Sequence, residues 1–228
     1  MSARRHGFLR SNSLSLAFLA IFLIALVGQA VAGQRLYNEE QRAHGDQTVS
    51  LGEFLTSSRF AVETTENWQS EVLQFTLYVF GTVWLIQRGS SESKKPGEEG
   101  GDSDEDAMVG PFAREDSPRW ARLGGLRSAI YSNSLVLVFG TIFLASWTAQ
   151  SVAGWRDYND DLAGHDQPLV SWWQYVRGAD FWDRSLQNWQ SEFLAVGTMA
   201  IFAVYLRQRG SPESKPVGAP HDDTTSND

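Results

Sequence analysis

Residues 13 to 33 read SLSLAFLAIFLIALVGQAVAG, about 20 residues without a formal charge. A helix of this length covers the hydrocarbon core of a bilayer, and within lipid a lone segment satisfies all its backbone groups only as a helix. The stretch 134–154 has the same length and is equally free of charge. Both stretches therefore predict transmembrane helices.

The two stretches belong to an internal repeat. A shift of 121 positions aligns 11–94 with 132–215 without a gap, and 35 of the 84 aligned residues are identical. The most specific shared segment, NWQSE at 67–71, returns unchanged at 188–192. We therefore expect a duplicated chain in which both copies have the same architecture.

A second, shorter apolar run follows in each copy. Residues 72–86 and 193–206 hold no charge, and the longer run would cover roughly 22 Å of a hydrocarbon core about 30 Å thick. We expect both helices to begin earlier, which gives spans of about 67–86 and 188–206. The predicted fold is all-α: a polytopic membrane protein whose four transmembrane helices form a tandem repeat of two helical hairpins.

Composition sets the predicted domain boundaries. The two-span units are expected at 1–94 and 122–210. The stretch 95–121 between them is rich in Glu, Asp, Gly and Ser, which is typical of a flexible acidic linker. An acidic docking segment is the alternative. The Pro, Gly, Ser and Asp content of 211–228 predicts a disordered C-terminal tail.

Basic residues near the span ends predict the orientation. Lys and Arg gather at the N-terminus, in the central linker and after the last span, whereas each loop inside a repeat holds three. Because cytoplasmic segments carry the excess of basic residues, both termini and the linker are expected in the cytoplasm. A cleaved signal peptide, with Arg4 and Arg5 before its apolar core and cleavage after Ala32, is the alternative for the first span. The matching 151–153 lies mid-chain, where no signal peptide acts.

Each loop carries a predicted helix start. Ser50 and Glu53 have the capping-box spacing, and so do Ser171 and Gln174. Aromatic residues crowd the second loop, and amphipathic aromatics concentrate at membrane–water boundaries. We therefore expect a short helix on the outer membrane surface before each second span. An ordinary loop that packs its aromatics on the span ends is the alternative.

Metal, cofactor and nucleic-acid sites are not expected. His44 and His165 are equivalent in the repeat, but a metal site needs three or more ligands, so solvated loop histidines are expected. Cysteine is absent, which excludes thiolate chemistry, and the net charge of −8 argues against nucleic-acid binding. No nucleophile–base pair or phosphate-binding loop is visible, so no catalytic residue and no enzymatic activity are predicted.

Polar residues recur inside the predicted spans. Gln29 lies near the outer end of the first span, at the depth where Glu71 begins the second. Polar side chains in lipid turn inward to find partners. The helical spacing therefore predicts one cluster of Gln29, Asn67, Ser70 and Glu71, and a twin cluster of Gln150, Asn188, Ser191 and Glu192.

Three interpretations of these clusters stay open. Interhelical hydrogen bonds, each worth about 1 kcal/mol, could lock the helix pairs. Glu71 and Glu192 could instead accept protons or cations in a transport or sensing site. In the third interpretation, the glutamates simply reach interfacial water.

Several repeated motifs resemble a known family. The opening SNSL, the Gln-x-x-Ala-Gly motif, the Tyr-Asn pair, His44 and the segment NWQSE are similar to an uncharacterised family of bacterial integral membrane proteins, a domain of unknown function. The resemblance covers both repeats. It implies residence in the bacterial plasma membrane, but no activity and no catalytic residue.

The expected function is that of a structural or accessory membrane protein. The expected partners are the lipid bilayer and either a second copy of the chain, as a homo-oligomer, or an unknown membrane protein. Binding to nucleic acid is not expected. A small transporter or channel component that uses Glu71 and Glu192 is the alternative. A membrane enzyme that uses these glutamates is the third hypothesis.

Overall fold

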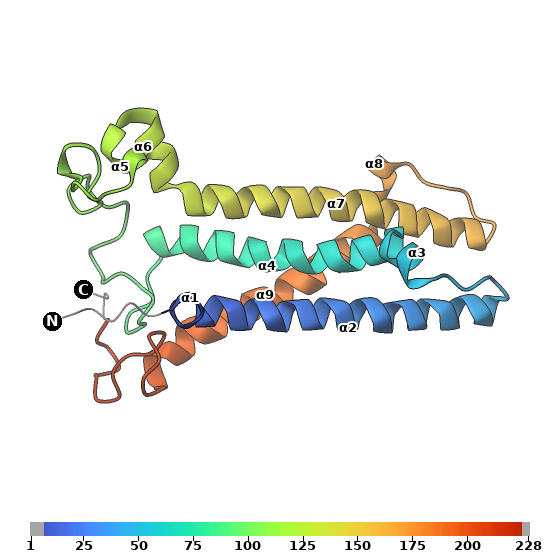
Figure 1. The fold of residues 1–228 in the computed structure, drawn as a ribbon, viewed down its shortest axis with the longest axis horizontal. Coiled ribbons are helices and arrows are strands. Elements are labelled where there is room, and N and C mark those ends of the chain that lie inside the picture. The colour runs from blue at the N-terminus through green and yellow to red at the C-terminus, as the bar shows by residue number, and fades with distance from the viewer. Residues whose placement is uncertain (1–6, 225–228) are drawn as a thin grey trace.

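Four long helices dominate the computed structural model, which describes residues 7–224. They are α2 (Ser13–His44), α4 (Ser58–Trp84), α7 (Ser134–Gly164) and α9 (Ala179–Tyr205). Helices α2, α4 and α7 run side by side, and α9 crosses behind them obliquely (Figure 1). Every regular element within the described range is a helix, which confirms the predicted all-α class.

Short helices connect the long ones. They are α1 (Phe8–Ser11), α3 (Leu51–Leu55), η1 (Gly110–Phe112), α5 (Arg119–Leu123), α6 (Gly125–Ser132) and α8 (Trp172–Tyr175). The order long helix, short helix, long helix occurs in both halves of the chain. Both ends of α9 lie 121 positions after those of α4, which is the spacing that aligns the sequence with itself.

Helices α2 and α7 are long and apolar enough to cross a membrane, with mean hydropathies of 2.5 and 1.7 over their most apolar windows. Each continues about ten residues beyond the apolar stretch, to His44 and Gly164, although the predicted spans end at Gly33 and Gly154. The polar extensions remain helical because the backbone hydrogen bonding does not depend on the polarity of the side chains.

The closest helix packing joins the two halves. Helix α4 packs along α7 and also contacts α9. Small residues allow this approach: a Cβ atom built on Gly154 would lie 3.2 Å from the Val62 side chain. Within each half, the contacts between long helices include large rings, such as Phe22 with Trp68. The core of the molecule therefore lies where α4 meets α7 and α9.

The loops that join α2 to α4 and α7 to α9 repeat the same hydrogen bonds. Both predicted capping boxes are confirmed, at Ser50 for α3 and at Ser171 for α8. The Asn38 amide donates to the carbonyl oxygen of Val49 at 2.9 Å and accepts from its N–H at 2.7 Å. Asn159 holds Val170 in the same way. These clamps give the asparagine of the repeated Tyr-Asn pair a structural role.

The segments at the opposite end form turns. The predicted linker 95–121 contains η1 and the start of α5 between its turns. The N–H of Gln87 donates to Ser93 Oγ, and that of Gln208 donates to Ser214 Oγ, both at 2.9 Å. The predicted tail is described as far as residue 224. Its last four residues, and the basic residues at positions 4 and 5, lie outside the described residues.

Candidate functional site

Three residues of the first predicted cluster line one groove. Gln29, Asn67 and Glu71 border a cavity of about 680 Å³ between α2 and α4, closed on one side by Ile142 of α7. The fourth residue, Ser70, is buried and donates to the carbonyl oxygen of Asn67 in its own helix at 2.9 Å. No hydrogen bond joins the Gln29 side chain to α4 in the described structure. These residues therefore line the groove without forming a hydrogen bond between the two helices.

In the second predicted cluster, the side-chain hydrogen bonds of Asn188 and Ser191 stay within α9. Gln150 is fully buried on α7, the helix that packs along α4, and no hydrogen bond joins it to α9 within residues 7–224. Asn188 donates to the carbonyl oxygen of Arg184 at 3.1 Å, and Ser191 donates to that of Asn188 at 2.8 Å. Helix α7 meets α9 through the ring of Trp147, which lies 6.0 Å from that of Trp189, and α4 packs against both helices.

The repeated glutamates approach each other across the two halves. Glu192 on α9 experiences electrostatic repulsion from Glu71 on α4. Neither carboxylate forms a hydrogen bond or an ion pair with any other residue in the described part of the chain. The two acids are therefore close enough to interact electrostatically, while Glu71 also lines the groove with Gln29 and Asn67.

Buried amides line the contact between the halves. Gln69 is fully buried, and its side-chain oxygen accepts a hydrogen bond of 2.9 Å from the indole of Trp189. Its amide nitrogen has no partner, and neither polar atom of the Gln150 side chain has one. Unpaired buried polar atoms are costly and therefore uncommon. These two glutamines are the clearest polar feature of the α4–α7–α9 core.

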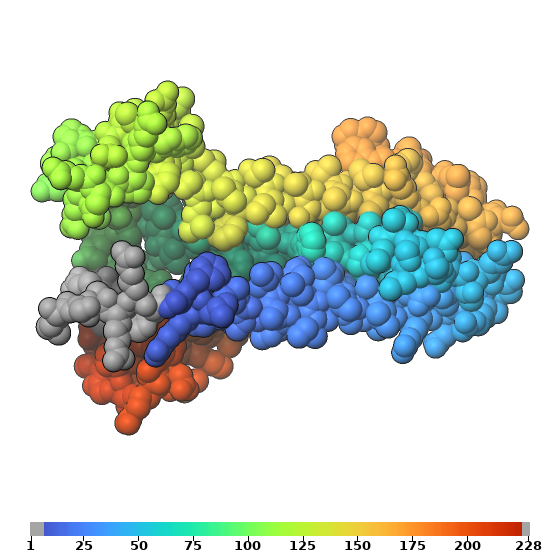
Figure 2. Space-filling model, in the orientation of Figure 1, coloured from blue at the N-terminus to red at the C-terminus, as the bar shows by residue number. Residues whose placement is uncertain are grey.

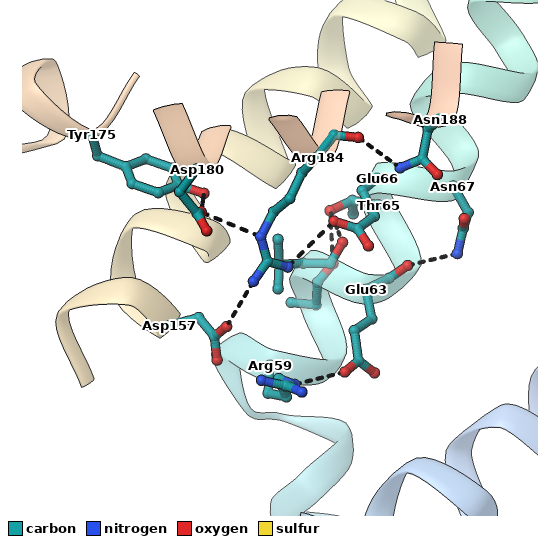
Figure 3. A network of polar contacts seen from close by, with 12 residues as sticks. Arg59, Glu63, Thr65, Glu66, Asn67, Asp157, Tyr175, Asp180, Arg184 and Asn188 are labelled. Carbon is teal, nitrogen blue, oxygen red and sulfur yellow. Dashed lines mark hydrogen bonds and ion pairs between the residues drawn. The ribbon is translucent and has the colours of Figure 1, made fainter. Parts of the chain in front are cut away.

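Beyond the apolar segments, six charged residues form a network (Figure 3). Its centre is Arg184 of α9, which lies 3.2 Å from Asp180 of the same helix, 3.5 Å from Glu66 of α4 and 4.0 Å from Asp157 of α7. We call this set the charged network: Arg59, Glu63, Glu66, Asp157, Asp180 and Arg184. It joins three long helices from both halves of the chain.

The charged network exchanges its signs between the repeats. Arg59 and Glu63 form an ion pair of 2.7 Å one turn apart on α4. The matching positions on α9 hold Asp180 and Arg184, with the charges reversed. Opposite charges therefore face each other where the halves meet, as between Arg59 and Asp157. Burial raises the pKa of both Glu66 and Asp157 above the ordinary values, and the positive charge of Arg184 opposes this shift at both acids.

Tyr175 of α8 closes the charged network on one side. Its hydroxyl donates to Asp180 at 3.2 Å, and its ring is buried. Burial, and then the neighbouring Asp180 carboxylate, raise the pKa of Tyr175 above its ordinary value. The hydroxyl therefore stays protonated and remains a donor throughout the physiological range.

The two loop histidines lie close to each other. The ring centroids of His44 and His165 are 6.5 Å apart, and both side chains border a polar pocket between the ends of α2 and α7. Each Nδ1 lies 2.9 Å from a carbonyl oxygen one turn earlier in its helix. Within residues 7–224, no group of three or more His, Cys, Asp or Glu is placed to hold a metal ion.

Comparison with protein families identifies the chain. The family described as a domain of unknown function, DUF6766, matches residues 5–226. The chain belongs to this family. No curated protein and no solved structure matches it.

In this DUF6766 protein, the charged network and Gln69 were not predicted as site residues. The repeat alignment contains a signal for the charged network, because Arg59 and Glu63 match residues of exchanged charge at 180 and 184. Gln69 lies inside the most specific shared segment, but its helical position separates it from the predicted cluster face. Chemically, the charged network can bind and orient helices through charge, and the groove at Glu71 can accept a cation or a proton.

Proposed function

We propose that the chain is an integral membrane protein that crosses the bilayer four times, as two duplicated helical hairpins. The observation that supports this most is the uncovered apolar surface of α2 and α7. In the most apolar 18-residue segment of each helix, only 6% is buried in α2 and 17% in α7. The core helix of a soluble protein is mostly buried, whereas Figure 2 shows the flank of α2 open along its length. Lipid is the solvent that suits such a surface.

Helices α4 and α9 supply the other two spans in this proposal. Each has 27 residues, which corresponds to about 40 Å of helix and exceeds the hydrocarbon thickness. Large apolar side chains on both helices are exposed, including Phe80 on α4 and Ile201 and Phe202 on α9. The spans are proposed at about 67–86 and 188–206.

The proposed orientation follows from the two ends of the molecule. The linker, α5 and α6 gather at one end, and α3 and α8 lie at the other (Figure 1). The linker end also holds most of the Lys and Arg residues, which cytoplasmic segments prefer. We place this end and both termini in the cytoplasm of a bacterial cell, and the charged network at the outer face of the plasma membrane.

A structural or accessory role, without catalysis, suits these contacts best. The charged network and the hydrogen bond from Trp189 to Gln69 both connect one proposed hairpin to the other. These contacts hold the two hairpins in a defined arrangement. An interhelical hydrogen bond in lipid stabilises such an arrangement by about 1 kcal/mol. We propose that the protein has a structural role in the membrane, either as a homo-oligomer or as an accessory to an unknown membrane partner.

Cysteine labelling tests the topology directly, because the chain contains no cysteine. In intact cells, a membrane-impermeant maleimide should label Asp46→Cys and Gln167→Cys in the outer loops. Gly101→Cys in the linker should react only after the membrane is permeabilised, and Ile24→Cys should resist both treatments. Labelling of Gly101→Cys from outside, or release of the chain by alkaline carbonate, would reject the proposal.

A transporter or channel component is the second candidate. One observation favours it: Glu71 lines the groove with Gln29 and Asn67, and it also acts electrostatically on Glu192. Acids that lie within proposed spans and lack ion-pair partners often mark ion pathways.

Flux measurements separate the two candidates. Liposomes that contain the purified chain should show proton or cation flux only if the second candidate is right. The double variant Glu71→Gln with Glu192→Gln should then abolish the flux while the protein still folds. Absence of flux with intact assembly supports the structural role.

A further inference from the structure

The packing of α4 against the other half uses one of two docking positions that the repeat offers. Helix α4 packs along α7, contacts α9, and places Gln69 beside Trp189. In effect, α4 occupies the groove between the two long helices of the other half. The 121-residue shift maps α4 onto α9, and it maps the groove between α7 and α9 onto the groove between α2 and α4.

This second groove is empty in the chain. It is the cavity of about 680 Å³ between α2 and α4, which is lined by Phe22, Ala25, Gln29, Trp68 and Glu71 among others. Four of these residues match Phe143, Gln150, Trp189 and Glu192 of the occupied groove without any change of residue type. Part of the side-chain chemistry that receives α4 is thus present a second time, and no helix of residues 7–224 fills this second groove.

The matching face of α9 is also unused. Leu73 on α4 is 9% exposed, whereas its counterpart Leu194 on α9 is 65% exposed. Ser70 is buried, and its counterpart Ser191 is exposed. Thr76 of α4 would lie 3.9 Å from a Cβ atom built on Gly140 of α7. Gly197 is the counterpart of Thr76 on α9, and a Cβ atom built there meets nothing within 4 Å.

One polar side chain on each surface also makes no hydrogen bond to residues 7–224. Gln190, the counterpart of Gln69, is exposed on α9 and makes no side-chain hydrogen bond to any residue in 7–224. The same holds for the indole N–H of Trp68, the counterpart of Trp189, at the empty groove. A side-chain amide without a partner is unfavourable in a bilayer, and an indole donor inside the membrane gains from an acceptor.

We propose that the chain forms a closed dimer in which α9 of each copy fills the groove between α2 and α4 of the other copy. The contact repeats the packing of α4 on α7 and α9, and the Trp68 indole donates to Gln190 of the second copy. Four hairpins then surround one two-fold axis. The inference rests on the proposed four-span topology.

A disulfide experiment tests the contact. Two chains with different tags are co-expressed, one with Leu19→Cys and the other with Gly197→Cys, the counterparts of Gly140 and Thr76. Mild oxidation of the membranes should join them into a mixed dimer. The matched control pairs Gly197→Cys with Ala17→Cys, which lies two residues from Leu19 on the opposite face of α2. Within one chain, Gly140→Cys with Thr76→Cys is the positive control.

Two outcomes would overturn the dimer. The first is an absence of mixed dimers above the Ala17→Cys level while the positive control cross-links. The second is a disulfide only within single chains that carry both Leu19→Cys and Gly197→Cys, because the groove would then be filled by the chain's own α9. The maleimide topology test reads monomers and dimers alike, so failure of the dimer is distinguishable from failure of the four-span proposal.

A second measurement does not depend on introduced cysteines. Native mass spectrometry from lipid nanodiscs should show the wild-type chain as a dimer. Gln190→Leu should raise the dimer dissociation constant about fivefold for each hydrogen bond that it removes, and Trp68→Phe should do the same. The double variant should be no weaker than either single variant, because both substitutions remove the same bond. A wild-type monomer that retains lipid in the groove would overturn the proposal.

Discussion

The indole nitrogen of Trp189 on α9 donates a hydrogen bond of 2.9 Å to the side-chain oxygen of Gln69 on α4. Both residues come from the segment NWQSE, one from each of its occurrences, but from neighbouring rather than matching positions. The bond therefore joins unlike surfaces of the repeat. This arrangement leaves two surfaces without a partner, the groove between α2 and α4 and the exposed face of α9. The proposed dimer joins these two surfaces.

Loss of this hydrogen bond should destabilise the contact between the halves. Trp189→Phe keeps most of the ring but leaves Gln69 buried with both of its polar atoms unpaired. We expect the free energy of unfolding to fall by about 1–3 kcal/mol. Denaturant titration of the solubilised monomer measures it. Trp84→Phe, at an exposed indole that makes no hydrogen bond in the described chain, should cost much less; equal effects would contradict the assigned role of the bond.

Arg184 should be the most sensitive residue of the charged network. Arg184→Met leaves Glu66, Asp157 and Asp180 without their shared cation. The side chain is about 30% exposed, so solvent screening reduces the penalty to about 2–4 kcal/mol. Thermal unfolding in detergent measures the loss.

The control for this variant is Arg177→Met. Arg177 is exposed, and its guanidinium lies over the ring of Trp173. We expect the variant to change the free energy of unfolding by about 1 kcal/mol or less. If both arginine variants lower the stability equally, the charged network does not stabilise the contact between the helices.

The start of α3 should depend on pH, and the start of α8 should not. Glu53 accepts the backbone N–H of Ser50 at 2.7 Å, and this hydrogen bond lowers its pKa below the ordinary 4.5. A lowered carboxylate pKa gives stabilisation that is complete above pH 4.5 and is lost as the pH falls through the folded-state pKa. Gln174 occupies the equivalent position in α8 and does not titrate.

Hydrogen exchange reports on the two capping boxes in the same molecule. Between pH 5 and pH 3, protection of the amides of Ser50 and Glu53 should fall more than protection of Ser171 and Gln174, after correction for intrinsic exchange rates. Glu53→Gln should remove the difference. A difference that persists in this variant would mean that another group causes the pH dependence.

Two matched glycines should tolerate alanine unequally. A Cβ atom at Gly154 would clash with the hydroxyl of Tyr175 and approach Val62 at 3.2 Å. At the equivalent Gly33, the nearest atom is Cζ of Phe54 at 3.0 Å, and no hydroxyl is present. We expect Gly154→Ala to cost about 1–3 kcal/mol and Gly33→Ala less.

Tyr175→Phe tests the cause of that difference. With Tyr175→Phe, a phenylalanine ring faces Gly154 as Phe54 faces Gly33. The added cost of Gly154→Ala should therefore fall towards that of Gly33→Ala. The comparison uses double-mutant cycles, since Tyr175→Phe alone also removes the hydrogen bond to Asp180. An unchanged cost of Gly154→Ala would show that the approach of α4, rather than the hydroxyl, is limiting.

Local features of the fold were predictable from the sequence. The apolar stretches, the capping boxes at Ser50 and Ser171, and the equal spacing of the long helices all depend on residues close together in the chain. The predicted span of about 13–33 lies within α2, which continues to His44; apolarity indicates the lipid-facing segment and not the end of the helix.

The candidate site was only partly predictable. Gln29, Asn67 and Glu71 line one groove, but Ser70 bonds within its own helix, and within residues 7–224 no side-chain hydrogen bond joins Gln150 to the predicted partners on α9. The prediction paired each long helix with its neighbour in sequence. Nothing in the helical periodicity indicates which of several apolar faces will pack against which helix.

The sequence by itself determined where the long helices lie along the chain, where α3 and α8 are capped, and that the two halves share a pattern of residues. These properties depend on backbone hydrogen bonds, capping and periodicity over a few turns. Only the tertiary structure decided that α4 packs on α7 and brings Glu71 towards Glu192. The physical reason is the shape of the surfaces. The bulky rings of Trp147 and Trp189 lie between α7 and α9, with their centroids 6.0 Å apart, while small residues such as Ser146 and Gly154 admit α4 to a close approach.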